Sequence, residues 1–177
     1  MEIGAFVRGI DLSTGELSPP VKEMVRTLGD MKGCYAVEGE ESTVVYRVLQ
    51  PEGQMSKEIT YAVTVLMPGK VGNEYFMTKG HFHKRPEAGE IYLCLRGEGL
   101  VLLQSRLGLV ETAQMRRGSI VHVPPGTAHR TINTGSENMI FIAFYSPDAG
   151  HDYESVTKSG FAKRVVEVDG RAELVDR

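Results

Sequence analysis

Cysteine is scarce in this chain, with Cys34 and Cys94 as the only two among 177 residues. Small secreted domains that depend on disulfides usually carry more. Long apolar runs are also missing, and none approaches the ~20 residues that a membrane-spanning helix needs. Residues 1–4 lack the basic start of a secretory signal, and no apolar stretch follows them. We therefore expect a cytoplasmic protein without a disulfide scaffold or a membrane span.

An excess of charge of one sign is missing as well. The formal net charge is −3 and the isoelectric point is near 6.0, so the chain has no basic footprint for nucleic acid or an anionic membrane. Its hydrophobic content of 41% and charged content of 24% are ordinary for a globular protein. A chain of this length can form one domain with a substantial core. We expect a single domain over residues 1–177, with no nucleic-acid or membrane partner.

Short β-rich runs separated by turn residues dominate the chain from residue 43 onward. Many short strands with no helical period between them indicate an antiparallel sandwich or barrel, and a jelly-roll double-stranded β-helix is one such fold. We place this barrel at about residues 41–160. The expected strands are Thr43–Leu49, Thr60–Leu66, Tyr75–Thr78, Glu90–Arg96, Gly99–Gln104, Leu109–Met115, Ile120–Val123, Arg130–Asn133 and Ile140–Tyr145.

Extensions are expected at both ends of the barrel. Within residues 1–40, apolar residues repeat at i, i+3, i+4 and i+7 from Val21 to Leu28, which predicts a short helix between an N-cap at Ser18 and a stop at Gly29. We expect this helix to cover a barrel face and to contribute nothing to the chemistry. Residues 161–177 read as a terminal hairpin, with Asp169-Gly170 as its turn.

Four potential metal ligands stand at spacings that packing alone does not explain. His81 and His83 are two residues apart, and residues i and i+2 of an extended segment point to the same face. Glu90 stands where a neighbouring strand would begin, and His129 follows a Pro-Pro-Gly turn. Three histidines and one glutamate suit a borderline divalent transition metal such as Fe, Mn, Ni, Co or Zn. A fifth histidine, His122, falls outside the pattern, and we expect it to be an ordinary strand residue.

These motifs resemble those of the cupin superfamily. The segment 118–133 fills every defining position of the second cupin motif, and 81–97 resembles the first. The first motif departs from the usual pattern in two respects: six residues separate His83 from Glu90, and Tyr75 replaces the usual glycine. Together with segments 64–70, 78–83 and 148–153, the long spacing resembles the archaeal-type cupin glucose-6-phosphate isomerases, over about residues 60–160.

The resemblance implies an all-β cupin barrel that interconverts glucose 6-phosphate and fructose 6-phosphate, a reaction of glycolysis and gluconeogenesis. It implies one divalent metal per subunit, with Fe²⁺ favoured, on His81, His83, Glu90 and His129, and a homodimer. Glu90 is our candidate for the base that moves a proton between C1 and C2. Tyr92 and Tyr145 should reach the same cavity. The expected contacts to the sugar phosphate are Thr64, Thr78, Gly80, Tyr92, Tyr145, His151 and Tyr153.

Two other functions use the same pattern. A cupin dioxygenase would also hold its metal with three histidines and a glutamate, but the long spacing and the segment 148–153 argue against it. A non-enzymatic sugar-binding cupin would tend to lose ligands, and none is lost here. Five basic residues near the motifs could supply donors to a phosphate, although surface solvation is expected for most of them: Lys70, Lys79, Lys84, Arg85 and Arg130.

Overall fold

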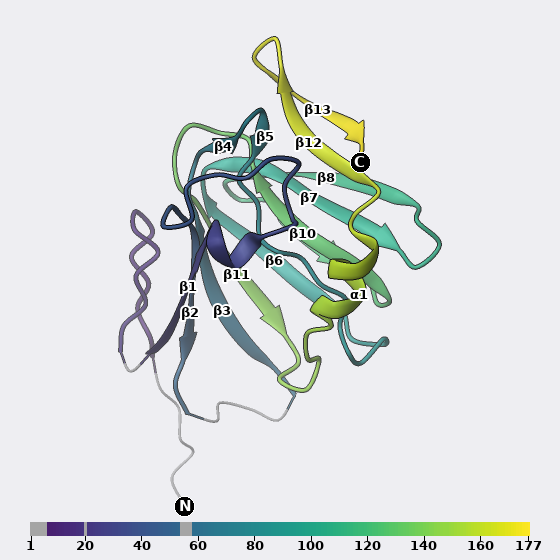
Figure 1. Cartoon of the computed structure of the whole chain (residues 1–177). Helices are drawn as coiled ribbons and strands as arrows, with labels where there is room; N and C mark the ends of the chain where they lie inside the picture. Colours follow the sequence, from purple (N-terminus) through teal and green to yellow (C-terminus); the bar gives the residue numbers. More distant parts are fainter. Residues whose placement is uncertain (1–6, 20, 54–57) are drawn as a thin grey trace, which may run out of the picture.

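The structure is a computed structural model that describes residues 7–19, 21–53 and 58–177. Strands account for most of it (Figure 1). Six strands form the largest sheet: β1 (Val21–Thr27), β2 (Val44–Pro51), β3 (Thr60–Leu66), β6 (Glu90–Arg96), β9 (Ile120–Val123) and β11 (Met139–Tyr145). Seven others form two smaller sheets: β4 (Lys70–Val71), β5 (Glu74–Tyr75), β7 (Glu98–Ser105), β8 (Val110–Arg116), β10 (Thr127–Asn133), β12 (Lys163–Val168) and β13 (Arg171–Asp176).

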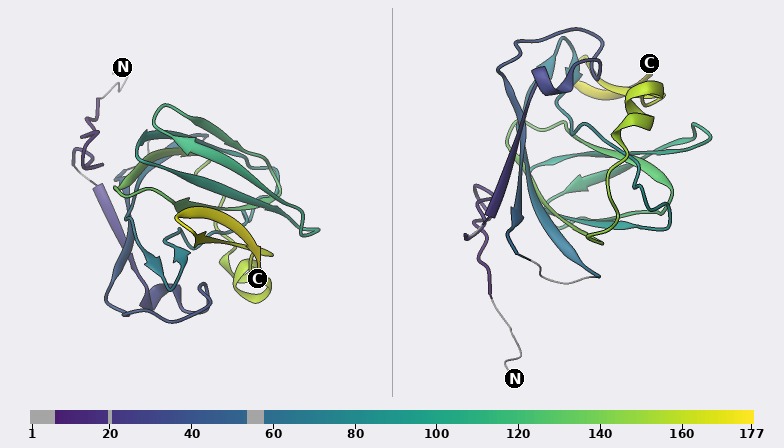
Figure 2. Two further views of the ribbon diagram at one scale, coloured as in Figure 1. Left: turned by 90° about the horizontal axis from the view of Figure 1, so that it is seen from above. Right: turned by 60° about the horizontal axis from the view of Figure 1, so that its bottom comes forward.

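The strand order explains how distant segments meet. The large sheet runs β1-β2-β3-β11-β6-β9, the second β10-β7-β8 and the third β13-β12-β5-β4. Every pairing among the described strands is antiparallel. The first two sheets lie on opposite sides of the barrel in both views of Figure 2. The antiparallel barrel predicted from the sequence is therefore confirmed.

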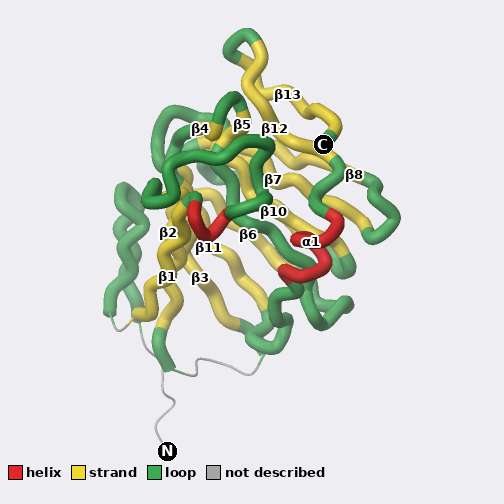
Figure 3. Tube along the Cα trace, in the orientation of Figure 1, coloured by secondary structure: helices red, strands yellow, loops and turns green. Residues whose placement is uncertain are grey.

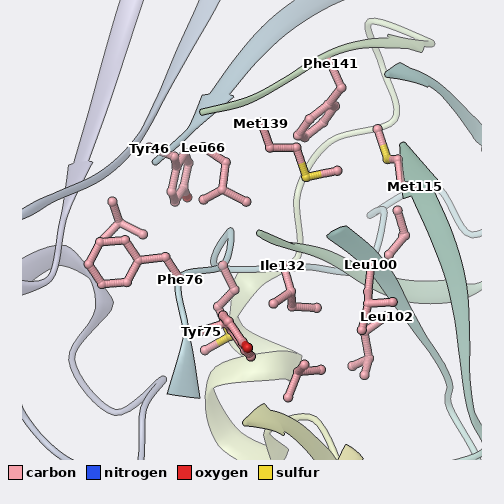
Figure 4. Packing of buried hydrophobic residues seen from close by; sticks show 14 of the residues in the cluster. Tyr46, Leu66, Tyr75, Phe76, Leu100, Leu102, Met115, Ile132, Met139 and Phe141 are labelled. Atoms are coloured by element: carbon pink, nitrogen blue, oxygen red, sulfur yellow. The ribbon is translucent and has the colours of Figure 1, made fainter. Parts of the chain in front are cut away.

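The core fills the space between these two sheets. Tyr92 and Phe141 contribute from the large sheet, whereas Leu102, Met115 and Ile132 contribute from the smaller one. Figure 4 shows side chains of the two sheets pointing toward one another across this core. Each large apolar side chain buried in this way stabilises the fold by ~1.5–3 kcal/mol. This packing holds the strands that carry the polar residues described below in fixed positions.

The predicted N-terminal helix is wrong. Residues Val21–Thr27 form strand β1, which pairs along its length with β2, and only a single 3₁₀ turn, η1 (Gly29–Met31), follows (Figure 3). Pro20, expected in the first turn of the helix, lies outside the described residues. Pairing with the edge of a sheet satisfies the backbone groups of this segment, and that tertiary contact overrides a helical period of only seven residues.

Most other strands agree with the sequence. The predicted bounds of Thr60–Leu66, Glu90–Arg96 and Ile120–Val123 coincide with β3, β6 and β9. The predicted strand Tyr75–Thr78 is wrong in extent, because β5 ends at Tyr75 and Met77 makes only an isolated bridge. The α-helix that the structure contains, α1 (Tyr153–Ser159), was not expected from the sequence.

The C-terminal hairpin forms as predicted. Strand β12 pairs with β13 from Lys163 to Val168, and the two turn residues have positive φ, 49° at Asp169 and 77° at Gly170. Two consecutive positive φ values are what a tight type I′ turn requires, and Asp-Gly adopts them readily. Helix α1 and this hairpin lie beside the barrel near β10 (Figure 1). No helix among the described residues is long and apolar enough to cross a membrane.

Candidate active site

The structure brings the four predicted metal ligands together. His81 bridges to His129 on β10, with backbone N–H to carbonyl distances of 3.3 and 3.1 Å. Glu90 begins β6, and His83 lies in the loop that leads to it. One ligand-type atom from each residue lies within 4.8 Å of the others. A cluster predicted from three separate parts of the sequence is therefore a single group in the structure.

Backbone carbonyls orient two of the imidazoles. His83 Nδ1 lies 3.0 Å from the Ala88 carbonyl oxygen, and His129 Nδ1 lies 3.3 Å from that of Thr127. A carbonyl can only accept, so each Nδ1 carries a proton, and in the neutral imidazole the lone pair is on Nε2, facing the cluster. His83 Nε2 and His129 Nε2 both lie 3.2 Å from Glu90 Oε2. This is the arrangement that second-sphere partners give to metal-binding histidines.

Unpaired nitrogens show that the group fits a cation. His81 Nε2 and His129 Nε2 are buried and have no hydrogen-bond partner among the described residues, although His129 Nε2 lies 3.2 Å from Glu90 Oε2. Buried polar atoms are normally satisfied. Two imidazole nitrogens beside one carboxylate make a set of ligand atoms that suits a borderline divalent metal. We therefore interpret the cluster as a metal site.

Burial and neighbouring charges shift the pKa values inside the cluster, in opposite directions for Glu90 and His83. Burial alone would raise the pKa of Glu90, but in the metal-free protein its close contacts with His129 and His83, which favour the carboxylate when these imidazoles are protonated, outweigh burial and lower the pKa to about 2. Burial lowers the pKa of His81 well below its usual value, helped by the neighbouring imidazoles. Burial also opposes protonation of His83, yet its contact with Glu90 raises the pKa overall. Glu90 is therefore an anion at neutral pH, and His81 is neutral.

A pocket of about 320 Å³ opens beside the cluster. Its wall includes His81, Glu90 and His129, so three of the four potential metal ligands face the space where a small molecule would bind. The seven predicted substrate contacts also line it, from five different parts of the chain: Thr64, Thr78, Gly80, Tyr92, Tyr145, His151 and Tyr153. Their roles remain predictions, but the fold gathers all of them around one cavity.

The loop before α1 closes one side of this pocket. Phe82 and Asp152 exchange backbone hydrogen bonds, and Asp152 also caps α1 by accepting from the Ser155 N–H at 3.1 Å. These contacts hold His151 with its ring 4.3 Å from that of His81 and stacked on Tyr153 at 5.6 Å. His151 is exposed to solvent although it touches the cluster. A ligand in the pocket would therefore cover it.

Several pocket residues escaped the sequence analysis. Arg26 and Tyr46 line the cavity, and they come from β1 and β2. Arg26 was overlooked because β1 was taken for a helix without chemistry. Lys79, for which surface solvation was expected, also lines the pocket, and with Arg26 it makes up the cationic part of the wall. Alternation along β1 would have revealed Arg26, since Met24 and Arg26 share the face that reaches the pocket.

His122 behaves as expected. It lies on β9 opposite Ile91, one position away from the residue that pairs with Glu90, and its side chain is exposed. Neighbouring strand positions point to opposite faces, so His122 faces away from the cluster. Cys94 is buried in the core and donates to the Arg96 carbonyl oxygen at 3.3 Å, as an ordinary small core side chain does.

Comparison with solved structures supports the fold. Oxalate decarboxylase from Bacillus subtilis superimposes with a TM-score of 0.50 at 22% identity, over 60% of this chain and 26% of that one. A second structure of the decarboxylase, a point mutant, gives a TM-score of 0.50 over 65% of this chain and 28% of that one. These are cupin-fold proteins, so the predicted fold class is confirmed.

Sequence comparison is more specific. Glucose-6-phosphate isomerase from Thermococcus kodakarensis is 47% identical over 94% of this chain and 92% of its own length. The enzyme of that name from Pyrococcus furiosus is 42% identical over the same shares. Residues 23–176 match the protein family described as "Glucose-6-phosphate isomerase (GPI)". With the cupin barrel and the His-Glu cluster in one pocket, these matches show that the chain belongs to the glucose-6-phosphate isomerase family.

Proposed function

We propose that this chain interconverts glucose 6-phosphate and fructose 6-phosphate with the help of one divalent metal. The observation that carries the proposal is the composition of a single pocket wall. Glu90 and two imidazoles of the ligand cluster share this wall with Arg26, Lys79 and the hydroxyls of Thr64 and Thr78. An aldose–ketose isomerase needs a proton carrier, an electrophile for two sugar oxygens and a grip on a remote phosphate.

The metal would be held by His81, His83, Glu90 and His129. A divalent cation bound there supplies a Lewis acid that polarises the sugar oxygens at C1 and C2. The ligand chemistry suits Fe²⁺, which we favour, as well as Mn²⁺, Ni²⁺, Co²⁺ and Zn²⁺. His83 and His129 are held ready by the carbonyls of Ala88 and Thr127, so little reorganisation is needed on binding.

Glu90 is the carboxylate placed to carry a proton between the two carbons. It is 6% exposed, lines the pocket and is ionised at neutral pH, because its pKa is lowered to about 2. Such a pKa makes Glu90 a weak base while both imidazoles hold it. We therefore propose that Glu90 loosens from the cluster when substrate binds, which raises its basicity, and then moves the proton through an enediol.

Thr78 and Gly80 are shaped for the phosphate end of the substrate. The Thr78 hydroxyl oxygen accepts from the Thr131 N–H at 3.0 Å, so its own hydrogen remains available to a ligand. Gly80 has a φ of 75°, and a Cβ there would lie 2.8 Å from the Phe161 ring and 3.0 Å from the His129 carbonyl oxygen. Only glycine fits this close packing and this φ, so the backbone beside Thr78 can line the pocket without a side chain.

We add Arg26 to the residues proposed to bind the phosphate group. A sugar phosphate carries about two negative charges at neutral pH, and charge-assisted bonds from a guanidinium are the strongest that a side chain can offer it. Arg26 reaches the pocket from the edge strand β1, and Lys79 reaches it from the segment before His81. We therefore propose both cations, together with Thr78 and Gly80 in the same pocket wall, as phosphate ligands.

Assembly and location follow from the family resemblance. We propose a cytoplasmic homodimer of single-domain subunits. Strand β1 is the last strand on its side of the large sheet, and among the described residues no other strand pairs with its outer edge. Its exposed Val25 adds apolar surface there, and uncovered edges of this kind favour association. Light scattering coupled to size exclusion tests the dimer directly.

A coupled isomerase assay with parallel oxygen uptake tests the activity. Purified protein should convert fructose 6-phosphate to glucose 6-phosphate, lose that activity on chelation and regain it with Fe²⁺ or Mn²⁺. Oxygen uptake without isomerisation would instead identify a dioxygenase. Saturable sugar binding without either reaction would identify a binding protein.

A further inference from the structure

A second cavity lies close to the active-site pocket. The loop after η1, the segment from α1 to β12 and the strand β10 form its walls, and its volume is about 50 Å³. One water needs ~10–15 Å³ on this measure, so the space suits an ion with a few oxygen atoms. Six cationic side chains and no carboxylate side chain line it: Lys32, Lys79, Arg130, Lys163, Arg164 and Arg177.

The positive charge of this cavity is only partly compensated. Glu41 pairs with Lys32 at 2.7 Å, and Asp176 pairs with Lys163 at 2.6 Å. Arg164 has only a long contact, 3.9 Å, with Glu74. Among the described residues, the remaining three cations have no carboxylate within salt-bridge distance: Lys79, Arg130 and Arg177. Several like charges around one small space repel each other unless an anion joins them.

Arg130 is the most unusual member of the group. Its side chain is nearly buried, at 6% exposure, and its guanidinium lies over the Phe161 ring at 3.9 Å. One terminal nitrogen donates to the Lys79 carbonyl oxygen at 2.8 Å, and the other has only the Met77 sulfur at 3.0 Å. Nε has no partner among the described residues. A buried cation with unused donors is costly, and an anion in the adjoining cavity would offset that cost.

We propose that this cavity is a second binding site, separate from the substrate pocket, for a tetrahedral oxyanion of the phosphate class. Arg130 forms its buried wall, and Arg177 and Lys79 add the charges that have no carboxylate partner. Planar guanidinium groups match the oxygen spacing of a phosphate. The small volume favours free phosphate over a phosphate monoester, whose organic group would need to leave through the cavity mouth.

The two cavities share Lys79, which lines both of them. Its carbonyl oxygen accepts from Arg130, and Arg130 directly follows His129 in β10. An anion that draws Arg130 or the Lys79 ammonium toward itself would change the position of Thr78 and Gly80 on either side of Lys79. A phosphate ion bound in the second cavity should therefore alter turnover in the substrate pocket. This effect on turnover rests on the proposed isomerase activity, whereas the binding of phosphate to the second cavity does not.

An NMR titration tests the site on the full-length, metal-loaded protein. The Nε–H signals of ¹⁵N-labelled arginine side chains are followed while inorganic phosphate replaces chloride at constant ionic strength. We expect the Arg130 signal to shift and saturate. A shift that stays linear with phosphate, or an equal shift with chloride alone, would mean an adventitious ion only and would overturn the proposal.

Matched variants localise the response. Arg177→Ala should weaken phosphate binding by about tenfold to a hundredfold, and Arg177→Lys, which keeps the charge, should weaken it less. Arg171→Ala removes an exposed arginine from the same hairpin and should bind as wild type does. Thermal melts show that each variant is folded. Equal affinity in the folded Arg177→Ala and wild-type proteins would refute the assignment.

Two further experiments distinguish binding in the substrate pocket from binding in the second cavity. Arg26→Ala removes a cation from the substrate pocket alone and should leave the Arg130 titration unchanged, and glycerol phosphate should bind more weakly than free phosphate. In the isomerase assay, phosphate should change kcat at saturating substrate in wild type and not in Arg177→Ala. Purely competitive inhibition in both proteins would overturn the link through Lys79 while leaving the binding result to stand on its own.

Discussion

Two sets of residues line the substrate pocket, the ligand end and the proposed phosphate end, and they are built in different ways. The ligand end consists of four residues within a span of 49 positions, and two of them, Glu90 and His129, lie within paired strands of the barrel. The phosphate end gathers Arg26, Thr64 and Lys79 from β1, β3 and a loop. The ligand end combines a carboxylate with imidazoles, two of whose Nε2 atoms have no hydrogen-bond partner among the described residues, whereas the proposed phosphate end combines two cations with a hydroxyl. Changes at the first should destroy chemistry, and changes at the second should weaken binding.

The largest effect is expected from the ligand end. His129→Ala removes a buried imidazole whose Nε2 faces the cluster without a partner, so metal content and isomerase activity should both fall to background. Elemental analysis and the coupled assay measure the two quantities. His122→Ala is the matched control, because His122 is exposed on the opposite face of β9. Full activity in metal-free His129→Ala would contradict the assignment.

Glu90→Gln should have the next largest effect. The amide keeps the size and one oxygen but cannot carry a proton, so we expect turnover to fall by about 10²–10⁴-fold in protein that still holds some metal. Turnover in deuterated water adds a second readout, because an enediol route should place solvent deuterium in the product. High activity in metal-loaded Glu90→Gln without deuterium incorporation would favour a hydride shift instead.

Arg26→Ala should have a smaller effect of a different kind. Loss of a charged hydrogen bond to the phosphate should raise KM by about tenfold to a hundredfold and leave metal content unchanged. Lys22→Ala removes an exposed cation from the same face of β1 and serves as the control. If Arg26→Ala lowered metal content as His129→Ala does, the distinction between the two ends would fail.

The smallest effect concerns acid stability of the metal-free protein. The pKa of Glu90 is lowered from 4.5 to about 2 in the folded state, so the unfolded state binds more protons between these values. The stabilisation from Glu90 is therefore fully present above pH 4.5 and is lost as pH falls toward 2. Urea unfolding at several pH values should show a shallower loss in Glu90→Gln than in Arg26→Ala. Parallel profiles in the two variants would argue against an ionised, paired Glu90.

Local patterns in the sequence were sufficient for the ligand end. His81, His83, Glu90 and His129 could be chosen because strand parity and a Pro-Pro-Gly turn fix where such side chains point. The same reasoning gave the bounds of β3, β6 and β9 and the Asp169-Gly170 turn. The predicted cupin fold and membership of the glucose-6-phosphate isomerase family are confirmed by the structural and sequence matches. The functional roles of the individual residues stay predictions.

The sequence by itself determined the barrel, because alternation and turn residues are local patterns, and it determined the ligand cluster and the family, because motifs at characteristic spacings can be recognised without the fold. Only the tertiary structure decided that Val21–Thr27 is a strand, that Arg26 reaches the substrate pocket and that Arg130 is buried beside a second cavity. These three facts depend on pairing with β2 and on packing against Phe161. Such contacts join residues far apart in the chain, and no periodicity within a short segment encodes them.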